Sequence, residues 1–272
     1  MKIKNKIKSY SVIIAYLIIG LIIMGTVQLI KLPNWLNSSI IILLLFILIN
    51  IITSKIFKLD NDIKTFWSLK KIPYLFLGII IGGLIVTTPI LVGLIIGKIS
   101  INEIILCTDV ARPVSTILSI LLTLVIITWE ELWFRGIFLN YCNKHLSAIN
   151  ISIIIGLLFM LVHILNPEIN LLKTGPTLSF AGAFLTIVYF YFKTIWLPIG
   201  LHFGNNFFTF ETKIENHLIL GNEGYFGAFL LAGLFFLFVV LIRKKSKNNF
   251  NNSKIISQYD LFEYTVKMKN NF

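Results

Sequence analysis

The chain consists of long apolar stretches separated by short polar segments. A run of about twenty apolar residues is long enough to cross a bilayer as an α-helix. Inside lipid the backbone must satisfy its own hydrogen bonds, which favours helices. The pattern therefore predicts an all-α membrane protein, a bundle of about eight transmembrane helices. The predicted helices are 10–30, 38–54, 73–97, 115–140, 148–165, 177–193, 195–210 and 225–242.

These helices are expected to form one domain, because the apolar region shows no internal repeat. We predict a single transmembrane helical domain at residues 1–245, with a motif-bearing core at 115–210. Residues 246–272 are rich in Asn and Lys and are predicted to be a polar cytoplasmic tail. Several prolines stand at or near predicted helix starts, where a missing N–H is tolerated. They are Pro73, Pro113, Pro176 and Pro198.

Composition and charge place the chain in a membrane. Of the 272 residues 57% are hydrophobic, and the mean hydropathy is +0.87. The net charge of +12 lies mainly beside predicted helix ends, before the first helix and after the second and eighth. Basic flanks mark the cytoplasmic side, so we expect a multi-pass cell-membrane protein with both termini in the cytoplasm. The partner is then the bilayer and not nucleic acid. Abundant Lys, Ile and Asn resemble an AT-rich bacterial genome and suggest a bacterial plasma membrane.

One predicted helix carries three charges in the stretch "WEELWFRG". Ionisable side chains inside a span are costly and are functional candidates by default. Glu131 and Arg135 are four residues apart and can pair on one face. Glu130 points about 100° away from Glu131 around the helix and faces something else. The alternative is that these charges only hold helices together.

Two further predicted helices carry polar side chains one turn apart. The stretch "FMLVH" contains Phe159 and His163, and "HFGNN" contains His202 and Asn206. Taken singly, such residues are more often packing or hydrogen-bonding groups between helices. Together with Glu130 they provide a base, two imidazoles and an amide, which is the set needed to activate water inside a bundle.

Two observations bear on how these helices meet. Gly200 and Gly204 flank His202 at the same four-residue spacing, which predicts the close approach of another helix. His163 is expected near the outer end of its helix, whereas Glu130 lies nearer the middle of its own. At 1.5 Å per residue this offset is about one to two turns. A tilt, a kink or a shifted helix boundary would remove it.

The three motifs, in this order, resemble those of a known family. "EELWFR" matches EExxxR, "FMLVH" matches FxxxH and "HFGNN" matches HxxxN. They are similar to the CPBP intramembrane proteases, which comprise CAAX prenyl endopeptidases and bacteriocin-processing or bacteriocin-immunity proteins and are also called the Abi family. The resemblance covers residues Ser115 to Thr209.

The resemblance implies an endopeptidase that cuts a membrane-associated protein or peptide. It implies that Glu130 deprotonates a water molecule that His163 helps to hold. His202 and Asn206 would donate hydrogen bonds to the oxyanion, whose charge fixed donors stabilise strongly in a dry site. The expected supporting residues are Glu131, Arg135 and Phe159.

The metal dependence of such a site is a separate question. Two histidines and a glutamate also form a zinc ligand set, and the ligands here would be Glu130, His163 and His202. The chain contains no HExxH sequence, the helical motif of many zinc proteases. We therefore expect no bound metal, with zinc as the alternative.

Other functions fit the sequence less well. A catalytically silent homologue could act as a bacteriocin-immunity or scaffold protein, and the complete motif set argues against it. A proton-coupled transporter could use buried Glu and His residues, but repeated halves with matched broken helices are not visible. A serine protease centred on Ser179 lacks a nucleophile motif.

Overall fold

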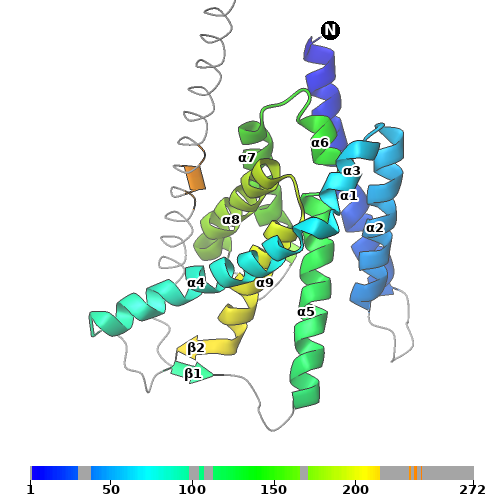
Figure 1. Ribbon diagram of the computed structural model, residues 1–272. Helices are drawn as coiled ribbons and strands as arrows, with labels where there is room; N and C mark the ends of the chain where they lie inside the picture. The colour runs from blue at the N-terminus through cyan, green and yellow to red at the C-terminus, as the bar shows by residue number, and fades with distance from the viewer. Residues whose placement is uncertain are drawn as a thin grey trace, which may run out of the picture. The chain divides into compact units, whose positions relative to one another are not determined.

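The computed structural model describes residues 2–29, 38–97, 104–106, 113–165 and 171–214, with four isolated positions between 233 and 240. The chain divides into two compact units, 1–229 and 230–272. The labelled elements of Figure 1 all belong to the first unit. The predicted helix 225–242 lies outside the described residues, apart from the isolated positions. The tail 246–272 lies outside them entirely.

The first unit is almost entirely helical (Figure 1). Its α-helices are α1 (Lys2–Leu29), α2 (Ser38–Ile56), α3 (Asp60–Phe66), α4 (Pro73–Ile95), α5 (Pro113–Phe134), α6 (Phe138–Cys142), α7 (Ala148–Val162), α8 (Leu171–Phe192) and α9 (Trp196–Glu211). Five helical spans in the described part are long and apolar enough to cross a membrane. The prediction of a helical membrane bundle is confirmed.

Large apolar side chains face outward on the long helices, as a lipid environment requires. Leu44 of α2 and Ile80 of α4 are each 60% exposed, and Leu118 of α5 is 56% exposed. Soluble monomers rarely expose contiguous apolar patches of this extent. These side chains therefore mark the lipid-facing surface of the bundle.

The structure differs from the sequence prediction in four places. The predicted helix 115–140 is two helices, α5 and α6. The polar segment 55–72 contains the short helix α3 and a 3-10 turn at Leu69–Lys71. Pro176 lies inside α8, because that helix begins at Leu171. Two short strands, β1 (Ile104–Leu106) and β2 (Thr212–Ile214), pair antiparallel.

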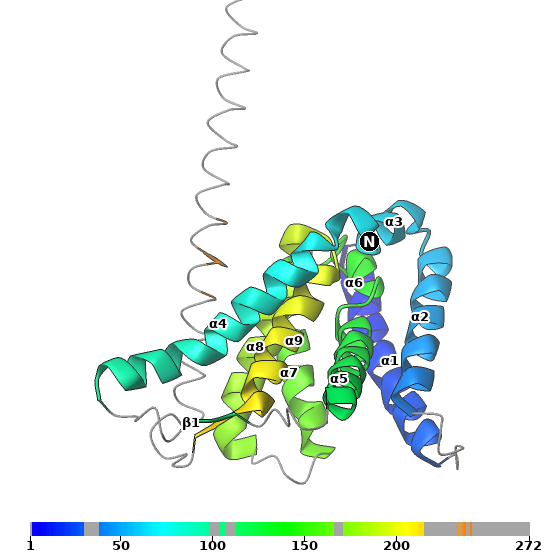
Figure 2. The same cartoon turned by 60° about the horizontal axis from the view of Figure 1, so that its bottom comes forward.

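The helices pack in pairs around α9. Helix α9 packs along α4, and α7 packs along α8; both pairs lie side by side in Figures 1 and 2. Helix α2 packs on α5, and α9 also contacts α5 and α8. The three helices that carry the sequence motifs, α5, α7 and α9, are therefore brought together in one bundle.

Aromatic packing fixes the end of α5 that carries the first motif. The Phe46 ring of α2 is fully buried and stacks on Trp129 and Trp133 of α5, with ring centres 6.1 and 5.9 Å away. The Tyr16 ring of α1 stacks on Phe138 of α6 at 4.1 Å. Such pairs stabilise a core beyond the effect of burial alone. Helices α1 and α2 thus hold the motif-bearing part of α5 in a fixed position.

Candidate active site

Helix α5 ends within the first motif, one residue before Arg135, and a buried amide stabilises the break. The helix ends at Phe134, and α6 begins at Phe138. Asn50 of α2 donates from Nδ2 to the Leu132 carbonyl oxygen at 3.3 Å, and its Oδ1 accepts from the Ile137 N–H at 2.7 Å. An interrupted helix leaves backbone groups without partners, which is costly in apolar surroundings. Asn50 satisfies two of these groups.

Glu131 and Arg135 form a buried ion pair, which confirms the pairing predicted from their spacing. Arg135 Nη1 lies 3.0 Å from Glu131 Oε1, and both side chains are 0% exposed. Arg135 Nη2 also donates to the Gly182 carbonyl oxygen of α8 at 2.8 Å. Its guanidinium carbon lies 5.1 Å from the centre of the Phe159 ring of α7. Charge-assisted bonds of this kind are strong, so the pair ties α5 to its two neighbours.

His202 of α9 lies between the two glutamates. Its Nδ1 is 2.8 Å from Glu131 Oε1, and its Nε2 is 3.6 Å from Glu130 Oε2. An ionised carboxylate only accepts hydrogen bonds, so Nδ1 carries a proton beside Glu131. Nε2 can then donate only when the ring is doubly protonated. Glu131 therefore sets the orientation of His202, a contact that the sequence did not reveal.

His163 stands at the C-terminal end of α7 and is oriented by its own helix. Its Nδ1 lies 2.7 Å from the Phe159 carbonyl oxygen, and a carbonyl only accepts, so Nδ1 is the donor. In the neutral ring Nε2 is then left with its lone pair. The Phe159 ring lies beside both histidines, with centre-to-centre distances of 4.7 Å to His163 and 5.9 Å to His202.

Glycines on the contacting surfaces of α9 and α4 let the two helices pack closely, and this packing fixes the position of His202. A Cβ added to Gly200 or Gly204 would collide with the carbonyl oxygens of Leu75 or Ile79 in α4. In return, Gly82 of α4 lies against the α9 backbone. Small residues at four-residue spacing permit this approach. The predicted close contact is confirmed, and its partner is α4.

Two chambers meet at the motif residues. The α9-side chamber has a volume of about 560 Å³ and is lined by Glu130, His163, His202 and Asn206. The rest of its lining is mainly apolar and also includes Thr123, Thr177 and Asn205. The α1-side chamber has a volume of about 550 Å³ and lies among residues of α1, α5 and α7. Glu130, Phe159 and His163 line both. These three residues are the shared wall.

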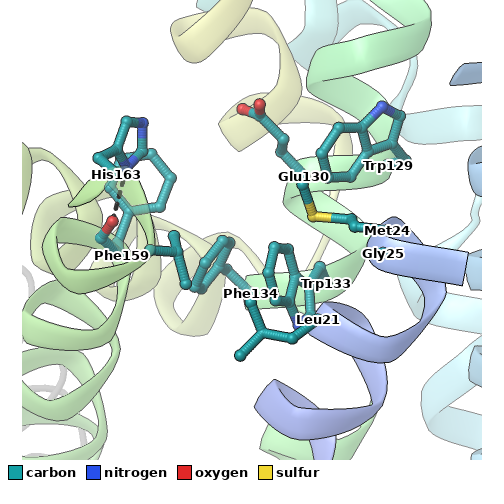
Figure 3. A pocket seen from close by; sticks show the side chains of 10 residues that line it. Leu21, Met24, Gly25, Trp129, Glu130, Trp133, Phe134, Phe159 and His163 are labelled. Carbon is teal, nitrogen blue, oxygen red and sulfur yellow. Dashed lines mark hydrogen bonds between the residues drawn. The ribbon is translucent and has the colours of Figure 1, made fainter. Parts of the chain in front are cut away.

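Figure 3 shows the shared wall from the α1-side chamber. The Glu130 carboxylate projects from α5 toward the side on which His163 lies. Glu130 and His163 line the same two chambers, so the offset expected from their positions along their helices does not keep them apart. The predicted helix 115–140 ends at Phe134, and α6 and α7 follow it in the chain before His163. The structure brings together all four predicted catalytic residues at the α9-side chamber.

Two residues that support this arrangement were not predicted. Asn50 is an amide inside an apolar span, a signal that the sequence carried. Gly182 packs against Phe159 and Gly156 of α7, and its carbonyl oxygen accepts from Arg135 and from Thr186 Oγ1. Nothing in its sequence context distinguishes this glycine from others in the chain.

The zinc alternative can be compared with the positions of the possible ligands. Among the residues that the structure describes, no three His, Cys, Asp or Glu side chains are grouped so that they could hold a metal ion. The side chains of Glu130, His163 and His202 therefore do not form such a group in this structure. His202 instead directs Nδ1 to Glu131.

Comparison with known proteins gives one match. Residues 112–208 match the family model described as type II CAAX prenyl endopeptidase Rce1-like. The matched segment runs from the residue before α5 into α9 and contains all three motifs. A search of curated proteins finds no match to the chain. Residues 112–208, which carry the paired glutamates and both histidines, therefore resemble the type II CAAX prenyl endopeptidases.

Proposed function

We propose that the protein is an intramembrane endopeptidase that hydrolyses a peptide bond in a membrane-associated protein or peptide, with a water molecule activated by Glu130. The family match supports a protease of this general type. The observation that carries the proposal is the grouping of Glu130, His163, His202 and Asn206 around one chamber. These residues come from three separate helices, and each has a hydrogen-bonding role in peptide hydrolysis.

The water molecule would lie between Glu130 and His163. The Glu130 carboxylate accepts one of its protons, and the lone pair on His163 Nε2 accepts a hydrogen bond from the other O–H. His163 Nε2 can accept this bond because His163 Nδ1 already carries the ring proton and donates it to the Phe159 carbonyl oxygen. The water oxygen then attacks the substrate carbonyl carbon as its proton passes to Glu130.

The tetrahedral intermediate would be stabilised from α9. His202 Nε2 and the Asn206 amide donate to the oxyanion, and doubly protonated His202 keeps its Nδ1 bond to Glu131. Collapse of the intermediate breaks the C–N bond, and Glu130 returns its proton to the leaving nitrogen. The products are a new carboxyl terminus and a new amino terminus, and Glu130 is regenerated as a carboxylate.

The proposal is tested with Glu130→Gln, which keeps the side-chain shape but removes the base. Membrane-peptide profiles of host cells with wild-type protein should contain cleavage products that are missing with Glu130→Gln. Asp60→Asn is the matched control, because Asp60 is an exposed carboxylate on α3. Identical profiles for wild type and Glu130→Gln would favour a catalytically silent immunity or scaffold protein, and Glu130-dependent proton flux without cleavage would favour a transporter.

We further propose a bacterial plasma membrane location with both termini in the cytoplasm. The basic residues beside the predicted helix ends support this orientation. Reporter fusions check it: a cytoplasm-active reporter at either terminus should be active. A periplasm-active or exported reporter at either terminus should be inactive, and the opposite result would reverse the proposed orientation.

A further inference from the structure

The hydrolytic mechanism leaves the α1-side chamber without a role. Beyond the shared wall, its lining consists of apolar and aromatic residues together with one glycine. They are Leu21, Met24, Gly25, Trp129, Trp133, Phe134 and Val162. We propose that this chamber is a specificity pocket for a bulky, uncharged apolar side chain of the substrate, on a residue close to the scissile bond. This inference rests on the proposed function.

The position of the oxyanion donors indicates how a substrate would lie. His202 and Asn206 line the α9-side chamber, whereas the lining described for the α1-side chamber does not include them. The scissile carbonyl oxygen must therefore point toward α9. The attacking water lies at the shared wall between Glu130 and His163. A substrate residue next to the reacting carbonyl can then direct its side chain across that wall toward α1.

The chemistry of the lining selects an apolar occupant. Glu130 and His163 are the ionisable groups among the lining residues, and the mechanism engages both. A charged substrate side chain would lose its hydration without gaining a free partner, which is costly. Met24 can adapt to side chains of different shape, and the flat rings of Trp129 and Trp133 offer a large contact area. The chamber volume of about 550 Å³ leaves room for an aromatic side chain.

One wall of the chamber can be altered without disturbing the helix packing. A Cβ added to Gly25 meets no atom within 4 Å, so a larger side chain there occupies open space. Gly20, on the same helix, lies against the Trp133 indole and offers no such room. Trp133 is itself held by a hydrogen bond from Nε1 to the Tyr16 carbonyl oxygen at 3.2 Å. Gly25→Phe should therefore reduce the chamber while the fold is kept.

The experiment compares cleavage preferences in a proteome-derived peptide library, read by mass spectrometry. Purified wild-type protein should prefer Leu, Phe or Met at one position near the cut. Gly25→Phe should lower cleavage of peptides with Phe or Leu there by at least tenfold relative to peptides with Ala. Ile22→Phe is the control, because Ile22 is on the same helix, is 60% exposed and lies outside the described lining of both chambers.

A variant in the other chamber gives the second readout. Thr123 lines the α9-side chamber, so Thr123→Phe should change the preference at a different substrate position. An unchanged preference in Gly25→Phe would overturn the inference and leave the proposed function intact. The inference would also be wrong if Gly25→Phe slowed all peptides equally in nanodiscs and not in detergent, since a lipid chain would then be the occupant. Absence of any Glu130-dependent cleavage by wild-type protein would overturn the proposed function itself.

Discussion

The buried pair Glu131–Arg135 allows a quantitative test of how the site is held. Both side chains are 0% exposed and are joined at 3.0 Å. Removing one partner of a buried pair typically costs about 3–5 kcal/mol, because the other charge stays buried without compensation. We expect Glu131→Gln and Arg135→Met each to lower the free energy of unfolding by about 3 kcal/mol. The double variant should lose about 4 kcal/mol, because no uncompensated charge remains.

The expected coupling is therefore about 2 kcal/mol, within the range for residues in direct contact. The free energy of unfolding is measured for the four proteins in the same detergent micelles. Asp60 and Lys64 provide a control cycle, since they have the same four-residue spacing on α3 and are exposed. Their coupling should be no more than about 0.5 kcal/mol. Strict additivity in the Glu131–Arg135 cycle would refute the view that this pair acts as a unit.

Three further changes test other parts of the site. Asn50→Leu should lower the free energy of unfolding by about 1–3 kcal/mol for each of the two backbone groups left unsatisfied; equal stability to wild type would contradict its role at the end of α5. Gly204→Ala should destabilise the protein, because its Cβ meets the α4 backbone, whereas Gly25→Ala should not; equal melting temperatures would contradict the close packing. His202→Gln should retain part of the activity because it keeps a donor, while His202→Ala should lower kcat by about 10²–10³; equal kcat values for the two variants would argue against the oxyanion role.

Local patterns were sufficient to predict most of the helices. Apolar length predicted α2 and α4 almost to the residue, and the four-residue spacing predicted the Glu131–Arg135 pair. The early end of α5 was missed because the residues that produce it are distant in the chain. Asn50, which holds the break, is 87 positions from its partner Ile137.

The composition of the site was easier to predict than its connections. Spacing on one helix showed that Glu130 and Glu131 face in different directions. It could not show that His202 contacts both, because these contacts join residues at least 71 positions apart. The two chambers depend likewise on how α1, α5, α7 and α9 pack, and no local pattern encodes the space left between helices.

Isotope transfer from solvent tests most directly whether Glu130 activates water for peptide hydrolysis. Purified wild-type protein and Glu130→Gln are incubated with the peptide library in H₂¹⁸O, with a metal chelator present throughout. With wild-type protein each new carboxyl terminus should contain one ¹⁸O atom, formed at a rate that the chelator does not change. With Glu130→Gln no labelled product should form above background. Labelled products from Glu130→Gln at the wild-type rate, or wild-type activity that chelation removes and zinc restores, would contradict the proposed mechanism.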